Sequence, residues 1–196
     1  MPQYDSFPQT MDRESLSLLQ HIHPHIYAWS RYDEPSHCYH NGYWLCLSEG
    51  QALINPPLMD EYLLEAFEAL AQIDVVILMA PVDSHTLQTT IQLCEQLDVP
   101  CLAPTNVQTD LLEAGLPFER YVPLKRGLEL FDCIQPMQCK TEDGKSTLVL
   151  SWPDQELLFT PMGLSVTDVR DLALDQGFDT HLPAVGEPLL FDAFEV

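Results

Sequence analysis

The sequence predicts a layered α/β domain, and two observations carry that prediction. First, an amphipathic pattern over 59–71 runs into an unbroken apolar segment over 74–80, and a second helix and strand follow at 84–97 and 99–103. This order is typical of βαβ units. Second, strand-like segments dominate from residue 120 onward. A chain of 196 residues can bury one core, so we expect a single domain over 1–196.

Before residue 59, the sequence predicts one short helix followed by strands. Leucines among polar neighbours over 13–21 indicate the helix, within an N-terminal extension over 1–24. Clusters of aromatic and aliphatic residues predict three strands, over 25–30, 43–47 and 52–54. The pairs Asn41–Gly42 and Glu49–Gly50 are turn formers, so we expect a turn at each.

The central helix and strand are the clearest local patterns. Over 59–71, Leu63, Leu64 and Phe67 recur at helical spacing, and acidic residues occupy the first turn, where the helix dipole favours them. The segment over 74–80 begins with β-branched residues and contains no polar side chain after Asp74. It therefore indicates a strand that is buried on both faces.

The second half of the chain predicts a meander. Apolar clusters indicate four strands, over 120–123, 128–135, 146–152 and 155–160. Turn-forming residues over 142–145 and 152–154 separate the last three strands. Ser165 is a suitable cap for a last helix over 166–176, and the acidic tail over 181–196 has no predicted order.

Charge and cysteine usage limit the partners and the compartment. Eight Lys and Arg against 30 Asp and Glu give a net charge of −22, which repels phosphates, so we expect neither nucleic acid nor a membrane as partner. The N-terminus lacks the basic start and apolar stretch of a signal peptide. Six scattered cysteines without a C-x-x-C pair indicate reduced thiols. Together these features predict a cytoplasmic protein.

Four stretches in this order resemble the metallo-β-lactamase superfamily. They are Asn41 to Pro57, Ile73 to Met79, Leu87 to Pro104, and Leu157 to Thr160, and the resemblance covers about residues 25 to 165. It implies a four-layer αββα sandwich of two mixed sheets flanked by helices. It also implies a metal motif, Thr-His-x-His-x-Asp-His, directly after the buried strand, where a zinc pair would activate a water.

This chain departs from that motif at most of its ligand positions. In an alignment with the motif without gaps, Ala80 and Val82 replace the first two histidines and Ser84 replaces the aspartate. Only the last histidine remains, as His85. If the alignment is shifted by one residue, Asp83 takes the position of the motif aspartate, but the paired histidines are still missing. Apolar side chains cannot ligate zinc. We therefore expect no cofactor, with zinc as the alternative.

Other positions implied by the resemblance are altered as well. Around Gln138, where the family has a Thr-Pro-Gly-His segment, no histidine occurs, and Met162 stands at the position of the bridging aspartate. Asn55 replaces an acidic residue that normally supports the site. His181 is the one residue left that could serve as the last family histidine.

The remaining histidines form weaker patterns. In an extended chain His21, His23 and His25 would share one face at about 7 Å spacing and could chelate a metal, but an exposed connector kinked by Pro24 is the preferred interpretation. His37 and His40 form a second weak metal signal. Asp83 could orient His85 as a general base, although a helix cap formed by Asp83 and Ser84 is favoured.

Two functions follow from these observations. The first is a non-catalytic, metal-free member of the metallo-β-lactamase fold that binds a protein or small molecule, or pairs as a homodimer. The alternative is a metal-dependent hydrolase with a site rebuilt around Asp83 and His85, joined by N-terminal histidines. Ser84 is a further catalytic candidate of the same groove. The weak metal candidates for that alternative are His85, Asp83, His37, His40, His23 and His25. A third interpretation is that the chain has a different α/β fold.

Overall fold

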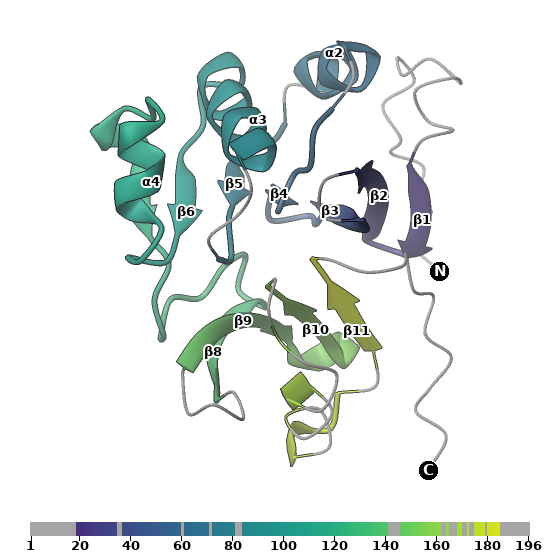
Figure 1. The fold of residues 1–196 in the computed structure, drawn as a ribbon. Coiled ribbons are helices and arrows are strands. Elements are labelled where there is room, and N and C mark those ends of the chain that lie inside the picture. The colour runs from purple at the N-terminus through teal and green to yellow at the C-terminus, as the bar shows by residue number, and fades with distance from the viewer. Residues whose placement is uncertain are drawn as a thin grey trace.

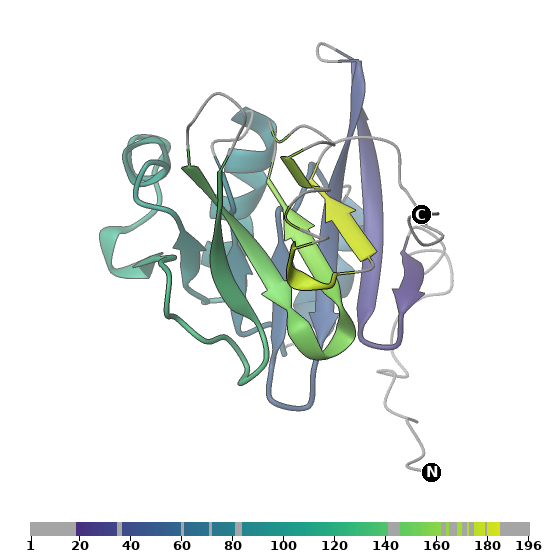
Figure 2. The same cartoon turned by 90° about the horizontal axis from the view of Figure 1, so that it is seen from below.

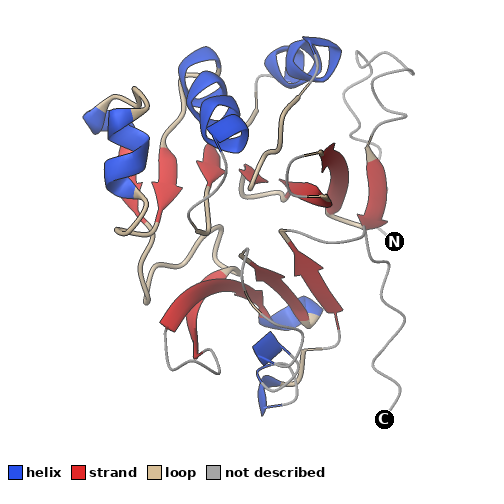
Figure 3. Cartoon of the chain, viewed as in Figure 1, coloured by secondary structure: helices blue, strands red, loops and turns tan. Residues whose placement is uncertain are grey.

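Two β-sheets pack face to face and carry helices on their outer faces, as a computed structural model shows (Figures 1 and 3). The structure describes residues 19–34, 37–59, 61–70, 72–80, 84–140, 146–161, 164, 168–169, 172, 175–178 and 180–184. Helices α2 (Glu61–Leu70), α3 (Ser84–Gln96) and α4 (Gln108–Glu113) lie over the first sheet, and helical residues between 168 and 176 lie beneath the second (Figure 3). This arrangement confirms the predicted αββα architecture.

The first sheet is mixed and holds seven strands in the order β1-β2-β3-β4-β5-β6-β7. The strands are β1 (Gln20–His23), β2 (Ile26–Asp33), β3 (Cys38–Cys46), β4 (Gln51–Ile54), β5 (Val75–Ile77), β6 (Cys101–Ala103) and β7 (Tyr121–Pro123). The pairings from β1 to β4 are antiparallel, and those from β4 to β7 are parallel. Helices α2 (Glu61–Leu70), α3 (Ser84–Gln96) and α4 (Gln108–Glu113) connect the parallel strands. The predicted βαβ series is therefore confirmed.

The second sheet holds four strands in the order β11-β10-β9-β8, and it faces the viewer in Figure 2. Its strands are β8 (Gln135–Lys140), β9 (Ser146–Trp152), β10 (Leu157–Thr160) and β11 (Thr180–Pro183). Strands β8, β9 and β10 form an antiparallel meander, and β11 pairs parallel with β10. The sequence predicted β9 and β10, but β8 was not predicted, and the strand predicted over 120–123 is β7 of the first sheet. Residues 181–183 were expected to belong to a tail of uncertain order, but this parallel pairing makes them part of a strand.

Alternating side chains divide the core into layers. On the helix side of the first sheet, Trp44 and Val76 pack with Phe67 of α2. Leu45 and Ile77 point the other way and meet Phe159 of the second sheet. Each of these six side chains is almost fully buried. A sheet covered on both faces explains why the segment over 74–80 is apolar throughout.

The expected turn at Asn41–Gly42 is wrong, because both residues lie inside β3. A Cβ atom on Gly42 would lie 2.5 Å from Cδ of Pro57 and 2.6 Å from Cζ2 of Trp29. The glycine therefore serves close packing rather than a turn. The side-chain amide Nδ2 of Asn41 donates a hydrogen bond to the carbonyl of Pro183 at 2.9 Å and so connects β3 to the end of β11.

Two further predictions of local structure are wrong. Residues 128–135 do not form a strand, since Phe131 and Asp132 adopt positive φ angles of 52° and 57° and Leu130 bridges to Ile134 across the resulting turn. The helix predicted over 13–21 fails in its described part, because Gln20 and His21 belong to β1. Its residues 13–18 lie outside the described part of the chain.

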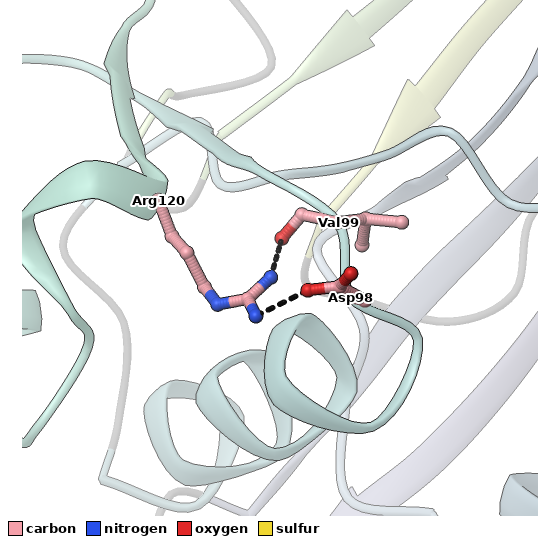
Figure 4. A network of polar contacts seen from close by, with 3 residues as sticks. All are labelled: Asp98, Val99 and Arg120. Carbon is pink, nitrogen blue, oxygen red and sulfur yellow. Dashed lines mark hydrogen bonds and ion pairs between the residues drawn. The ribbon is translucent and has the colours of Figure 1, made fainter.

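A polar contact links the connections on both sides of β6 (Figure 4). Arg120 ends a short 3-10 helix, Phe118–Arg120, and its guanidinium forms an ion pair with Asp98 and donates to the carbonyl of Val99 at 3.4 Å. Asp98 follows α3 and is mostly exposed, so water screens this pair. The contact nevertheless orients the entry to β7. No described helix has the length and apolarity needed to cross a bilayer.

Candidate functional site

The end of β5, where the resemblance implies metal ligands, is held together by Asn55. Asn55 follows β4 with a φ of 47° and is buried. Its Oδ1 accepts a hydrogen bond from the backbone N–H of Met79 at 3.0 Å, and its own N–H donates to the carbonyl of Ile77 at 2.8 Å. The side chain of Asn55 therefore joins two strand ends, and the neighbouring Ala80 adds only a buried methyl group.

A small pocket opens beside the first turn of α3, and we call it the α3 pocket. It has a volume of about 160 Å³. Its lining residues are Arg31, Tyr32, Asp33, His40, Pro57, Leu58, His85 and Thr86. His85 is exposed and His40 is buried, and strand pairing places Arg31 opposite His40. The structure thus brings together two of the predicted candidates, whereas Asp83 lies outside the described residues.

The remaining candidates near this pocket lie at its margin. Ser84 is the exposed first residue of α3 but does not line the pocket. His37 is exposed at a φ of 53°, and its Nδ1 lies 3.4 Å from the Tyr32 hydroxyl. The rings of Tyr32 and Tyr39 contact each other at a centroid distance of 5.2 Å. An aromatic pair therefore lies beside the connection between β2 and β3.

His23 and His25 lie at the opposite end of β2 from the α3 pocket. The eight residues of β2 span roughly 23 Å at the usual rise of a strand. Pro24 lies in the turn that joins β1 to β2, so the connector links two strands and not a helix and a strand. The ring centroids of His23 and His25 lie 5.8 and 5.9 Å from that of Trp152. These imidazoles pack on an indole and cannot reach His85.

His181 does not face the space between the sheets. In β11 it pairs with Leu158, and Leu182, its neighbour in sequence, belongs to the core between the sheets. Because strand side chains alternate, His181 points to the outer face, where its Nε2 is hydrogen-bonded to the Thr160 hydroxyl at 2.6 Å. Burial lowers the pKa of His181 to about 4. It is therefore a neutral structural histidine at pH 7.

The donor set in the described part of the chain does not fit the two-zinc centre that the resemblance implies. Within those residues, no three or more His, Cys, Asp or Glu side chains are grouped so that they could hold a metal ion. Gln138 is exposed on β8, and Met162 and Val82 lie outside the described residues. A zinc site requires about four ligands near 2 Å, three of them from the protein even in an open catalytic site.

Sequence reasoning missed Arg31 and Asp33 as members of the α3 pocket. Both side chains come from β2, which was predicted to end at residue 30. The polar residues Ser30 to Asp33 carry no strand pattern of their own. The register with β3, in which Arg31 pairs with His40 and Asp33 with Cys38, extends the strand.

The fold is shared with solved structures at low sequence identity. A metallo-β-lactamase from Pontibacter korlensis is 13% identical, with a TM-score of 0.62 over 86% of this chain and 90% of that one. The metallo-β-lactamase FIM-1 from Pseudomonas aeruginosa, solved in a mono-zinc form, is 13% identical, with a TM-score of 0.61 over 86% and 87%. The Flv1 flavodiiron core from Synechocystis sp. PCC6803 is 14% identical, with a TM-score of 0.60 over 82% and 53%.

Neither a protein-family model nor a curated protein sequence matches the chain. At these identities the structural similarity establishes the architecture. The two mixed sheets with their helices form an α/β fold that is consistent with these structures. This chain has the metallo-β-lactamase fold.

Proposed function

We propose that this chain is a metallo-β-lactamase-fold protein that binds a ligand or partner at the α3 pocket and does not use the zinc chemistry of the fold. The observation that carries the proposal is the end of β5. There Asn55 Oδ1 accepts the Met79 N–H, and Ala80 presents a methyl group. By the resemblance, Ala80 stands where the family has a histidine ligand. Asn55 stands where the family has a supporting acidic residue, and its side chain joins two strand ends.

The surface around the α3 pocket supports a binding role. Four large apolar side chains are exposed among the described residues: Tyr32, Tyr39, Leu58 and Phe118. Tyr32 and Leu58 line the pocket, and Tyr39 packs on Tyr32. Exposed apolar groups concentrated at one concave place are typical of binding sites. We also infer a cytoplasmic protein, since all six cysteines are free thiols.

A metal-dependent hydrolase with a rebuilt site is the second candidate, and one observation favours it. His40 and His85 line the same pocket as Asp33, so two imidazoles and a carboxylate lie around one small cavity. Such groups could act as base and acid toward a bound substrate. His21, His23 and His25 have no part in this alternative because they lie beyond the far end of β2.

Zinc titration by calorimetry at pH 7.5 separates the two candidates. We expect the wild-type chain to show no saturable zinc binding that depends on the α3 pocket. The His40→Ala/His85→Ala variant and a matched control, His37→Ala, should then give the same weak heats. Saturable binding of one equivalent that His40→Ala/His85→Ala abolishes and His37→Ala retains would favour the hydrolase and overturn the proposal.

A further inference from the structure

A second and larger cavity lies at the other end of the sandwich. It has a volume of about 770 Å³, which is within the usual range for small-molecule sites. Three connections enclose it: the β3–β4 turn, the loop before β8 and the turn between β9 and β10. Because β2 separates this cavity from the α3 pocket, it does not depend on the function proposed above. We call it the turn cavity.

The walls of the turn cavity are fixed by hydrogen bonds and close packing. The indole N–H of Trp44 donates to Gln51 Oε1 at 3.1 Å, and Gln51 Nε2 donates to Gln72 Oε1 at 2.8 Å. On the opposite side the ring of Phe131 lies directly on Gly50, where a Cβ atom would be 2.3 Å from Phe131 Cε1. A site whose walls are already ordered loses little entropy when a ligand binds.

Aromatic groups from both sheets contribute to these walls. Trp152 of β9 contacts the His25 ring at a centroid distance of 5.9 Å, and Tyr27 contacts Trp44 at 5.3 Å. All four residues line the cavity, together with Phe131. Aromatic walls bind apolar groups, and their π faces also attract cations.

Carboxylates supply the charge of the turn cavity. Glu49, Asp132 and Asp154 line it and are exposed, and no Lys or Arg occurs among its described lining residues. The pKa of the Cys133 thiol, in the same wall, is raised by burial and then by the nearby carboxylates of Glu49, Asp154, Asp132 and Glu129. Four carboxylates therefore lie near the Cys133 thiol, and a positively charged ligand would reduce the repulsion between them.

We propose that the turn cavity binds a small organic cation that carries an apolar group, with the apolar group against Trp152 and Phe131 and the cationic centre facing Asp132 and Asp154. An inorganic cation would leave the aromatic walls unused. An anion would be repelled by the carboxylates. The net charge of −22 further favours the approach of a cation.

The probe for the experiment is benzyltrimethylammonium, titrated into the full chain at pH 7.5 and low salt while the indole N–H signals are followed by NMR. Trp44 and Trp152 line the cavity and Trp29 does not, so we expect saturable shifts of the first two signals alone. Phenylacetate, an aromatic anion of similar size, should give no shift. Absence of saturable shifts with benzyltrimethylammonium, or equal shifts with phenylacetate, would overturn the proposal.

Two variants of equal net charge test the carboxylates. Asp132→Asn/Asp154→Asn should weaken binding of the probe by about fivefold per carboxylate removed, as expected for partly screened charges in contact. Asp110→Asn/Glu113→Gln removes two exposed carboxylates from α4 and should leave the affinity within about twofold, because neither residue lines the cavity. Equal weakening by the two variants would contradict a site at the turn cavity.

Discussion

Asn55 Oδ1 accepts the backbone N–H of Met79 at 3.0 Å, and this bond fixes the end of β5 beside the end of β4. Asn55→Ala leaves the buried N–H of Met79 without its acceptor and places alanine at a φ of 47°. We expect the free energy of unfolding to fall by about 2–3 kcal/mol. Urea denaturation measures this change. Asn106→Ala, at an exposed position, is the control and should have little effect.

Gly42→Ala tests the reason for glycine inside β3. The added methyl would lie 2.5 Å from Pro57 Cδ and 2.6 Å from Trp29 Cζ2, both in tightly packed surroundings. Such overpacking costs about 1–3 kcal/mol. Gly127→Ala is the comparison, since Gly127 has a φ of 83° and no described atom within 4 Å of the new Cβ. Gly127→Ala therefore reports the cost of backbone strain without packing, and a Gly42→Ala variant as stable as wild type in denaturation would contradict the packing explanation.

His181 predicts a pH dependence of stability. Burial lowers its folded pKa from 6.5 to about 4, so the unfolded chain binds more protons between these pH values. Stability is therefore complete above pH 6.5 and is lost as the pH falls toward 4, by up to about 3 kcal/mol. The difference between wild type and His181→Gln, measured by denaturation from pH 7.5 to 4, isolates this contribution. A difference that does not change with pH would show that His181 titrates normally.

Gly50→Ala tests the contact that closes the turn cavity. The new methyl would lie 2.3 Å from Phe131 Cε1 and would displace that ring. We expect a loss of about 1–3 kcal/mol and a shifted indole signal for Trp152, which shares the cavity, with the Trp29 signal unchanged. Urea denaturation and NMR measure the two effects. An unchanged Trp152 signal would argue against Phe131 as a wall of the cavity.

The fold could be predicted further than the site, and the reason is physical. Periodicity over 59–71 and the apolar run over 74–80 express burial, which acts on every residue of an element. The predictions of local structure were wrong where a single contact or backbone angle decides the structure. Gly42 lies inside a strand because a side chain there would clash with Pro57 and Trp29. Phe131 and Asp132 turn the chain through their positive φ angles. Neither effect has a periodic signal.

The α3 pocket depends on register and was predicted only in part. The sequence pointed to His85 and His40 separately, but their meeting requires β2 and β3 to pair so that Arg31 and His40 stand beside α3. In the same way, the length of β2 separates His23 and His25 from that pocket. Distances between side chains that are remote in sequence follow from such pairings. Local patterns of hydrophobicity do not reveal the register of those pairings.

The metal content of the purified chain tests the central claim most directly. The chain is produced in cells supplied with zinc and iron, purified without chelator, and analysed by mass spectrometry of the elements. We expect substoichiometric zinc and iron, unchanged in His85→Ala, because Ala80 after β5 and Asn55 after β4 supply no ligand to a metal. One or two equivalents of zinc or iron that fall in His85→Ala would contradict the account.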